Sequence, residues 1–191
     1  MSSAPARSHH QLRIIGGQWR HRRLAFYPAP GLRPTPDRVR ETLFNWLQPM
    51  MVGARCLDLF AGSGILGLEA ESRGASSVVW LENQPPVVAD LQQQLQRLKS
   101  TGQVIQADAL HWLQHAPPQV FDLVFLDPPF QTNALETSCH WLVQRGWLAS
   151  GAWIYVEQAI TQVFTHPASW QLWRQGKTQQ TRSSLFKVSA S

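Results

Sequence analysis

Short apolar segments alternate with longer amphipathic ones through the middle of the chain, and this alternation constrains the fold more than any other feature. The short segments suit strands, whereas the longer ones repeat their apolar residues at helical spacing. Strands that alternate with helices form βαβ units, so the sequence predicts an α/β fold with a mostly parallel sheet. The predicted strands are Cys56–Phe60, Ser77–Leu81, Val104–Gln106, Phe121–Leu126 and Ala152–Val156, and the predicted helices are Gly64–Arg73, Pro85–Lys99, Ala109–Gln114 and Asn133–Arg145.

The two ends of the chain lack this alternation. Near the N-terminus, Leu12–Gly17 and Leu24–Tyr27 lie on either side of a basic turn, which predicts a small β-hairpin. Near the C-terminus, Trp170–Arg174 and Ser184–Val188 flank a turn-like segment with no helix between them, which predicts a terminal antiparallel hairpin. We therefore expect a disordered leader over residues 1–11, a basic hairpin and loop over 12–34, and a main domain over 35–191.

One further helix is predicted between the first hairpin and the first strand of the main sheet. It follows a proline-punctuated loop, Pro28–Pro34. Thr35 can cap its N-terminus, Pro36 suits its first turn, and the charge of Asp37 favours the positive end of the helix dipole. The apolar spacing carries this helix to about Leu47.

Charge is divided unevenly along the chain. Residues 1–40 hold eight Arg and one acid and so carry +7. Residues 41–169 hold five bases and eleven acids and carry −6, and residues 170–191 hold four bases and carry +4. An acidic middle between two basic ends indicates a polyanion partner held by the flanks, with a different task at the centre.

Several protein classes are excluded by the same composition. Cys56 and Cys139 are too far apart for a cysteine knuckle and too few for a disulfide framework, and the histidines have no metal-ligand spacing, so we expect no metal. The N-terminal residues have no apolar core of a secretory signal, and no apolar run reaches the ~18 residues that span a bilayer. We expect a cytoplasmic protein that does not bind membranes.

A glycine-rich turn follows the first predicted strand. Gly62-Ser63-Gly64-Ile65-Leu66-Gly67 fits the G-x-G-x-x-G pattern of nucleotide-binding turns, and it opens a helix as such turns do. Glu82 ends the next strand, where a carboxylate accepts hydrogen bonds from ribose hydroxyls. An NAD-dependent oxidoreductase shows the same two features, and a tight turn without a ligand shows the first.

Two further acids favour S-adenosylmethionine (AdoMet) over a dinucleotide. Asp58 lies just before the glycine turn, where its charge would repel a pyrophosphate but attract an ammonium group. Asp108 ends the third strand, where a carboxylate can accept from an adenine amino group, although it also fits a plain helix N-cap. Acids at three successive strand ends match a ligand with a cationic amino-acid end and an adenosine end.

The fourth predicted strand runs directly into Asp127-Pro128-Pro129-Phe130. The prolines have no backbone N–H and fix φ, so a rigid turn presents the Asp127 carboxylate and the Pro128 carbonyl as acceptors. These acceptors can draw the protons of an exocyclic amino group on a base, and Phe130 offers a face for stacking that base. An ordinary Pro-Pro loop with a buried Phe is the alternative interpretation.

In this order, LRIIGGQWRHRRL, GLRPTPDRVRETLFNWL, LDLFAGSGILGLEA, DPPF and WIYVEQ resemble the RsmD family of bacterial 16S ribosomal RNA guanine-N2 methyltransferases. The resemblance covers nearly the whole chain after residue 11. It implies a Rossmann-like class I methyltransferase with a mostly parallel seven-stranded sheet, a C-terminal antiparallel hairpin and an N-terminal hairpin extension. It also implies AdoMet as cofactor, and a monomer that acts on 16S rRNA in an assembled or partly assembled 30S subunit.

The resemblance also assigns roles to residues of this chain. Asp127, Pro128 and Phe130 would form the catalytic, target-base site. The cofactor-binding residues would be Asp58, Gly62, Ser63, Gly64, Glu82 and Asp108, and the RNA-binding residues would be Arg13, Trp19, Arg20, Arg22, Arg23, Arg33, Thr35 and Arg38.

Arginine forks suit phosphates, and the aromatic residues among them offer stacking surfaces, although a basic face without a partner shows the same pattern. A DNA amino-methyltransferase shares DPPF and the glycine turn, but it usually carries a sizeable target-recognition insertion for which this chain has little room.

Overall fold

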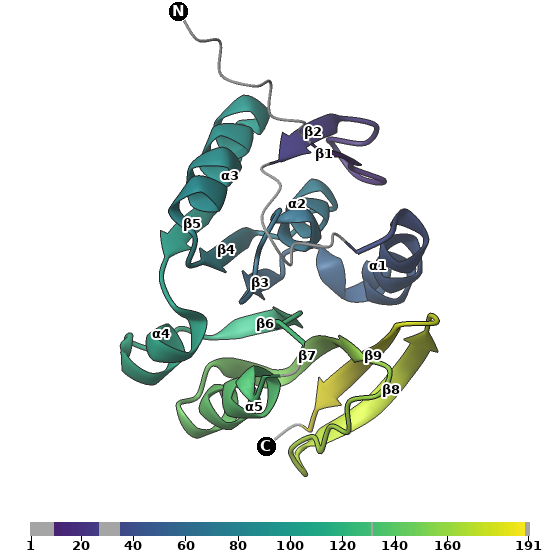
Figure 1. The fold of residues 1–191 in the computed structure, drawn as a ribbon, viewed down its shortest axis with the longest axis vertical. Coiled ribbons are helices and arrows are strands. Elements are labelled where there is room, and N and C mark those ends of the chain that lie inside the picture. The colour runs from purple at the N-terminus through teal and green to yellow at the C-terminus, as the bar shows by residue number, and fades with distance from the viewer. Residues whose placement is uncertain (1–9, 27–34, 131, 190–191) are drawn as a thin grey trace, which may run out of the picture.

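The structure, a computed structural model, describes residues 10–26, 35–130 and 132–189. Its main sheet is built from β3 (Arg55–Asp58), β4 (Ser77–Glu82), β5 (Gln103–Gln106), β6 (Phe121–Leu126), β7 (Leu148–Ala159), β8 (Trp170–Lys177) and β9 (Thr181–Val188). The strands are ordered β5-β4-β3-β6-β7-β9-β8 (Figure 1). The first five pair in parallel, and β9 runs antiparallel to both β7 and β8. The predicted mostly parallel sheet and C-terminal hairpin are confirmed.

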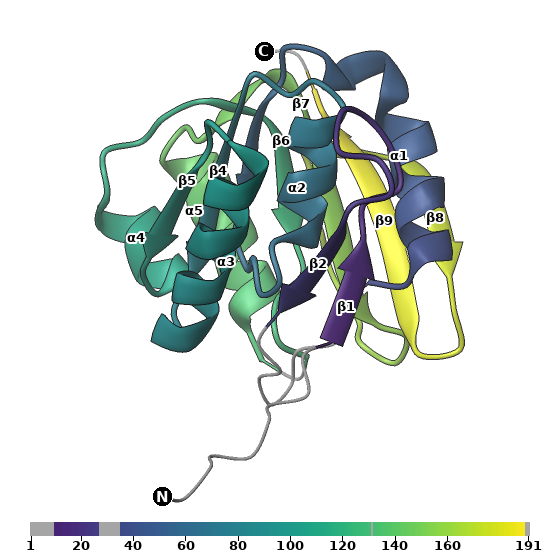
Figure 2. The same ribbon diagram turned by 90° about the horizontal axis from the view of Figure 1, so that it is seen from above.

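Helices cover both faces of the sheet (Figure 2). One face packs under α1 (Asp37–Met51), α2 (Ile65–Ser72) and α3 (Pro85–Leu98), and the other under α4 (Ala109–His115) and α5 (Ala134–Gln144). Strand β6 shows the consequence, since Phe125 is buried on the first face and Val124 on the second. A strand buried on both sides reads as a continuous apolar run, as β6 does. No helix in the described part of the chain is long and apolar enough to cross a membrane.

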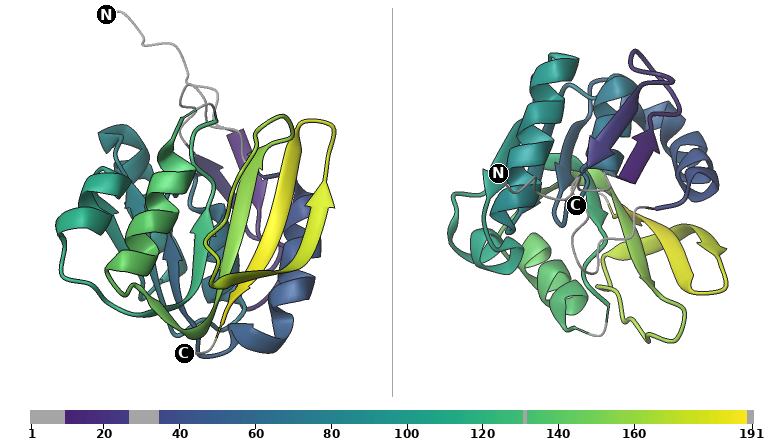
Figure 3. Two further views of the ribbon diagram at one scale, coloured as in Figure 1. Left: turned by 90° about the horizontal axis from the view of Figure 1, so that it is seen from below. Right: turned by 45° about the horizontal axis from the view of Figure 1, so that its top comes forward.

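The N-terminal hairpin shares the main core. Its strands, β1 (His10–Arg13) and β2 (Arg23–Phe26), pair antiparallel in the purple hairpin of Figure 3. Ile14, Trp19 and Leu24 are buried in the same cluster as residues of α1, α2 and α3. The strand predicted over 12–17 is shifted, since β1 begins at His10 and ends at Arg13, and Ile14 after it is buried in the core.

The predicted leader over 1–11 is two residues too long, because β1 begins at position 10. Its residues 1–9 and the predicted loop Pro28–Pro34 lie outside the described residues.

The N-cap predicted for α1 is wrong. The helix begins at Asp37 without a side-chain cap, and the Thr35 hydroxyl instead donates to Glu157 Oε2 on β7 (3.3 Å). The helix also continues past Leu47 to Met51, because Met51 still packs into the core and Pro49 falls in the last turn. The segment before α1 is thus fixed by the sheet rather than by its own helix.

Candidate active site

The parallel strands bring four carboxylates to one edge of the sheet. Asp58 ends β3, Glu82 ends β4, Asp127 directly follows β6, and Glu157 lies near the end of β7. Open α/β sheets bind ligands at the carboxyl ends of their strands, which is where these side chains lie. All four line one pocket of about 1300 Å³, together with Asp108, the glycine turn and the turn between β8 and β9.

Two of these acids hold the glycine turn in place. Glu82 Oε2 accepts from the backbone N–H of Gly62 (3.0 Å), and Asp58 Oδ2 accepts from the N–H of Gly67 (3.1 Å). Gly62 and Gly64 have φ of 51° and 73°, a conformation that favours glycine. The predicted G-x-G-x-x-G turn therefore forms between β3 and α2 and lines the pocket with Gly62 and Ser63.

Three of the pocket acids, Asp58, Asp127 and Glu157, have raised pKa values. Burial raises the pKa of Asp58 to about 7. The hydrogen bond from the Gly67 N–H opposes this rise, and the charge of Glu82 adds to it. Burial also raises the pKa of Asp127 well above its usual range, and the negative charges of Glu157 and Asp58 raise it further. The pKa of Glu157 is raised by burial too, although hydroxyl donors, among them Thr35, oppose the rise. A positively charged ligand would relieve this repulsion.

The charge of the pocket is one-sided. Its described lining residues include five acids and no Lys, Arg or His. Among the described residues, no group of three or more His, Cys, Asp and Glu side chains is arranged to hold a metal ion. The acidic lining thus matches the cationic ligand predicted from the strand ends.

The Asp-Pro-Pro-Phe segment forms one wall of the pocket. Asp127 is half-buried there, and no described residue donates a hydrogen bond to its carboxylate. Pro128 is buried, whereas the Phe130 side chain is 41% exposed at the rim. The Pro129 carbonyl accepts from the Thr132 hydroxyl (2.9 Å), which ties the turn to the start of α5. The segment therefore presents a free acceptor beside an accessible aromatic ring.

Asp108 forms the helix N-cap that one of its interpretations predicts, and its cofactor contact stays a prediction. Its Oδ1 accepts from the backbone N–H of His111 (2.8 Å), so it caps α4. It also lines the pocket, on the side formed by β4 and β5.

Glu157 is the pocket acid that the sequence interpretation missed. Its carboxylate accepts from the Tyr155 hydroxyl (2.9 Å) as well as from Thr35. The signal that could have found it is the one used for Asp58, Glu82 and Asp108, an acid at a strand end.

The basic turn of the N-terminal hairpin is exposed. Arg20, Arg22 and Arg23, called here the hairpin arginines, all face solvent. Trp19 does not, because it is only 5% exposed and packs in the core. Trp19 as an RNA-stacking residue is therefore a wrong prediction, since its ring forms part of the packing that holds the hairpin.

The other predicted RNA-binding residues lie in different surroundings. Arg13 is exposed and forms an ion pair with Asp37 (3.4 Å). Thr35 lines the acidic pocket, and Arg38 lies on the exposed side of α1, where it lines a second, smaller pocket. Arg33 lies outside the described residues.

A buried ion network that the sequence interpretation did not find joins the hairpin to α1 and α2. Arg40, fully buried, donates to Glu69 Oε1 (3.1 Å) and to the Arg13 carbonyl (2.9 Å). Glu69 also accepts from the backbone N–H groups of Ile15 (2.6 Å) and Gly16 (3.3 Å). The network fixes the direction in which the hairpin leaves the core and so positions the hairpin arginines.

A sheet in this strand order, with a ligand pocket at the carboxyl ends of its parallel strands, defines a Rossmann-like α/β protein, and the acidic lining of the pocket suits a cationic cofactor. The family model described as Conserved hypothetical protein 95 matches residues 12–187. Ribosomal RNA small subunit methyltransferase D from Escherichia coli (strain K12) is 46% identical over 183 residues, 94% of this chain and 91% of that protein. The chain therefore belongs to this family, the RsmD family.

Solved structures agree with this assignment. The putative methyltransferase yhhF from Escherichia coli is similar with a TM-score of 0.87 and 45% identity, covering 95% of this chain and 100% of that one. A more distant structure is that of RsmC from T. thermophilus, a 16S rRNA N2 methyltransferase in complex with AdoMet and guanosine. It has a TM-score of 0.69 at 20% identity over 95% of this chain and 50% of that one, which shows a shared fold.

Proposed function

We propose that this protein transfers a methyl group from AdoMet to the exocyclic N2 of a guanine in small-subunit ribosomal RNA. The observation that carries the proposal is the setting of Asp127, whose free carboxylate lines the same pocket as the other acids and follows β6 three residues before the exposed ring of Phe130. The Asp127 carboxylate would thus be shared by the cofactor site and the site for the target base. The name of the 46% identical relative supports the same substrate class.

The residues of the pocket fit AdoMet by their chemistry. Asp58 would hold the ammonium group of its amino-acid end beside the turn of Gly62 and Gly64. Glu82 would accept from the ribose hydroxyls, because each of its oxygens keeps a second lone pair: Oε2 accepts from the Gly62 N–H and Oε1 from the Gln84 N–H. Asp108 would accept from the adenine amino group. When bound, AdoMet supplies a methyl group that is already activated on a positively charged sulfur.

The task of Asp127 is to hold and polarise the amino group that is to be methylated. The lone pair of such an amino group is conjugated into the base, which makes it a poor nucleophile. The Asp127 carboxylate and the Pro128 carbonyl would accept hydrogen bonds from its two N–H groups, which favours the pyramidal nitrogen that attacks the methyl group. A positive charge in the pocket lowers the pKa of Asp127 again, so the carboxylate is ionised when it is needed. Phe130 would stack on the base. Holding the amino group in line with the methyl group would supply the rest of the rate enhancement.

The RNA would be held by the N-terminal hairpin. The hairpin arginines are exposed on a structural unit that is anchored to the core, which suits them to contact phosphates of folded RNA. We propose an assembled or partly assembled 30S subunit as the substrate particle and a monomer as the active form.

Methyl transfer from tritiated AdoMet tests the proposal directly. We would offer wild-type protein 30S particles, naked 16S rRNA and DNA, and analyse the methylated nucleosides by mass spectrometry. Label in N2-methylguanosine from small-subunit RNA is the expected result. Label in DNA would support a DNA amino-methyltransferase instead, and binding of NADH with no methyl transfer to any acceptor would overturn the proposal in favour of an oxidoreductase.

Asp127→Ala tests the proposed role of the acceptor. We expect turnover to fall about 100- to 1,000-fold, the usual effect of losing one electrostatic contact in a transition state. The affinity for AdoMet, measured by calorimetry, should change by less than about threefold. Asp122→Ala is the matched control, because Asp122 lies near the other end of β6 and pairs with Arg55 on the surface. Wild-type turnover in Asp127→Ala would remove Asp127 from the mechanism.

A further inference from the structure

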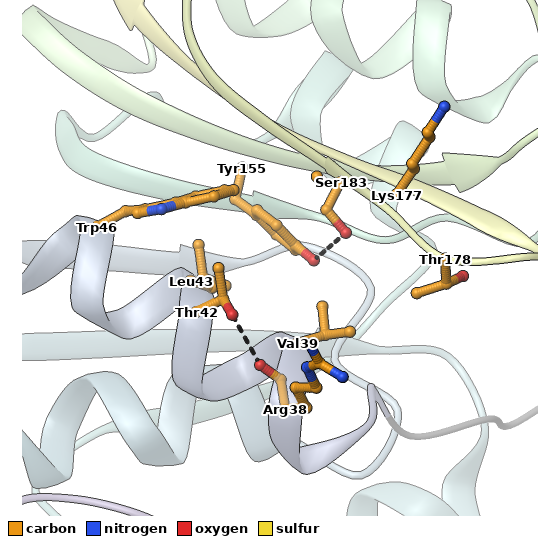
Figure 4. Close-up of a pocket in the computed structure, with 10 residues that line it drawn as sticks. Arg38, Val39, Thr42, Leu43, Trp46, Tyr155, Lys177, Thr178 and Ser183 are labelled. Atoms are coloured by element: carbon orange, nitrogen blue, oxygen red, sulfur yellow. Dashed lines mark hydrogen bonds between the residues drawn. The ribbon is translucent and has the colours of Figure 1, made fainter.

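A second pocket lies between α1 and the C-terminal hairpin. It has a volume of about 450 Å³, within the range of about 300–1,000 Å³ of small-ligand pockets. Figure 4 shows its wall on α1, where Arg38, Thr42 and Trp46 stand on successive turns at i, i+4 and i+8. Tyr155 on β7 and Ser183 on β9 face them from the sheet, hydrogen-bonded to each other at 3.2 Å.

This pocket adjoins the acidic one. Thr178, in the turn between β8 and β9, lines both. The Tyr155 hydroxyl, in the wall of the second pocket, donates to Glu157, which lines the acidic pocket. The two pockets are therefore neighbours, joined by Thr178 and by the contact between Tyr155 and Glu157.

The two pockets have opposite charge. The described residues that line the second pocket include Arg38 and Lys177 and no acid. Neither base forms an ion pair with any described residue, and both are exposed. Trp46 is half-buried, with its six-membered ring close to the Gly176 backbone. Free cations beside an aromatic ring and hydroxyl groups are what an unpaired nucleotide requires of a binding site.

We propose that the second pocket binds the base of a nucleotide next to the target guanine in the same RNA strand. The inference rests on the proposed function. Trp46 stacks on this base. Thr42, whose hydroxyl donates to the Arg38 carbonyl, and Ser183, which accepts from Tyr155, offer their remaining hydrogen-bonding capacity to its edge. Arg38 binds one flanking phosphate, and Lys177, whose ammonium points away from the pocket in Figure 4, binds the next one outside it. An enzyme that acts on a base must first take it out of the stack. Binding of the adjacent base keeps the strand unstacked while Asp127 binds the amino group of the target guanine.

Substitutions of Trp46 test the stacking contact. Trp46→Leu keeps an apolar side chain but removes the flat ring, whereas Trp46→Phe keeps a ring. We expect Trp46→Leu to raise the KM for RNA about 5- to 100-fold, the range for loss of one base–aromatic stack, with kcat changed less than about threefold. Trp46→Phe should restore most of this loss. The matched control is Trp141→Leu, at another half-buried tryptophan, on α5 over the opposite sheet face.

The salt dependence of RNA binding tests the phosphate contacts. Arg38→Gln and Lys177→Gln should each reduce the slope of log K against log salt by about 0.7, the value for one phosphate of a single strand. Arg97→Gln, at an exposed arginine on α3, should leave the slope unchanged. AdoMet affinity should stay at the wild-type value in all three variants, since these residues lie outside the acidic pocket.

The nucleotide-binding role of the second pocket and the proposed function of the protein are overturned by different results. If wild-type protein binds RNA but methylates only another acceptor, the proposed function is wrong. The RNA affinities of Trp46→Leu and Trp46→Phe then still show whether the second pocket binds a nucleotide. Equal affinities in these two variants and the wild type would overturn the nucleotide pocket while methyl transfer stands. A defect of Trp46→Leu on assembled particles but not on naked RNA would also overturn it, because the pocket would then hold a protein.

Discussion

Removal of the buried Arg40 guanidinium should destabilise the protein strongly. Arg40→Met keeps an unbranched apolar stem but deletes the bonds of the guanidinium to Glu69, to Asp37 and to the Arg13 carbonyl. Breaking one side of a buried ion pair costs about 3–5 kcal/mol. We expect the lower end, about 3 kcal/mol, because Glu69 keeps Arg73 (3.1 Å) as a partner and Arg40 Nε is already without one among the described residues. In a chain of 191 residues this lowers Tm by about 6–12 °C.

Thermal unfolding followed by circular dichroism measures this effect, with Arg55→Met as the control. Arg55 binds Asp122 through two nitrogens at 2.8 and 2.9 Å, but the pair is exposed, so its loss costs about 0–1 kcal/mol. The contrast between the variants isolates burial from ion-pair geometry. Equal shifts in Tm, or a shift below about 2 °C in Arg40→Met, would refute the structural role of the network. A double variant with Glu69→Gln should lose less than the sum of the single losses.

Three further predictions concern the pocket and the hairpin. Without ligand, protonated Asp58 stabilises the fold fully below its ordinary pKa of 3.8, and this contribution is lost as pH rises through about 7. Tm should therefore fall from pH 5 to pH 8, and Asp58→Asn should flatten the profile. Changing the hairpin arginines to Gln should lower the salt slope of RNA binding by about 2 to 3 and leave AdoMet affinity unchanged. Gly67→Ala would place Cβ 2.2 Å from Trp80 Nε1, so we expect a loss of about 1–3 kcal/mol in chemical denaturation and weaker AdoMet binding. Gly53→Ala, whose Cβ meets nothing within 4 Å, should leave AdoMet binding unchanged.

Local pattern was sufficient to predict the order of the elements. The apolar run of Phe121–Leu126 and the leucine spacing of Pro85–Leu98 each encode their own structure, and both segments form where predicted. The end of the first β-hairpin strand and the environment of Trp19 were not predictable in this way. Their positions depend on contacts with α1, α2 and α3, which lie far away in the sequence.

The residues of the site differ in the same way: some could be predicted from the local sequence, and others depend on distant contacts. Asp58, Glu82, Asp108 and Asp127 could be predicted because position at a strand end is a property of the local sequence. Glu157 directly follows the predicted strand Ala152–Val156, so the same local signal was present there and was not used; the strand itself runs on to Ala159. The role of Thr35 was hidden, since a Thr before Asp37 has the sequence of a cap but binds Glu157, 122 residues later.

The bonds from Ile15 and Gly16 to Glu69 set an order of events during synthesis. These partners are 54 and 53 residues apart, so at about 5–20 residues per second the hairpin waits roughly 3–11 s for α2 to be made. A lone two-stranded hairpin is at best marginally stable in water. The basic turn therefore becomes ordered only once the glycine turn and α2 exist, and a chain arrested before residue 69 cannot display its arginines in their final arrangement.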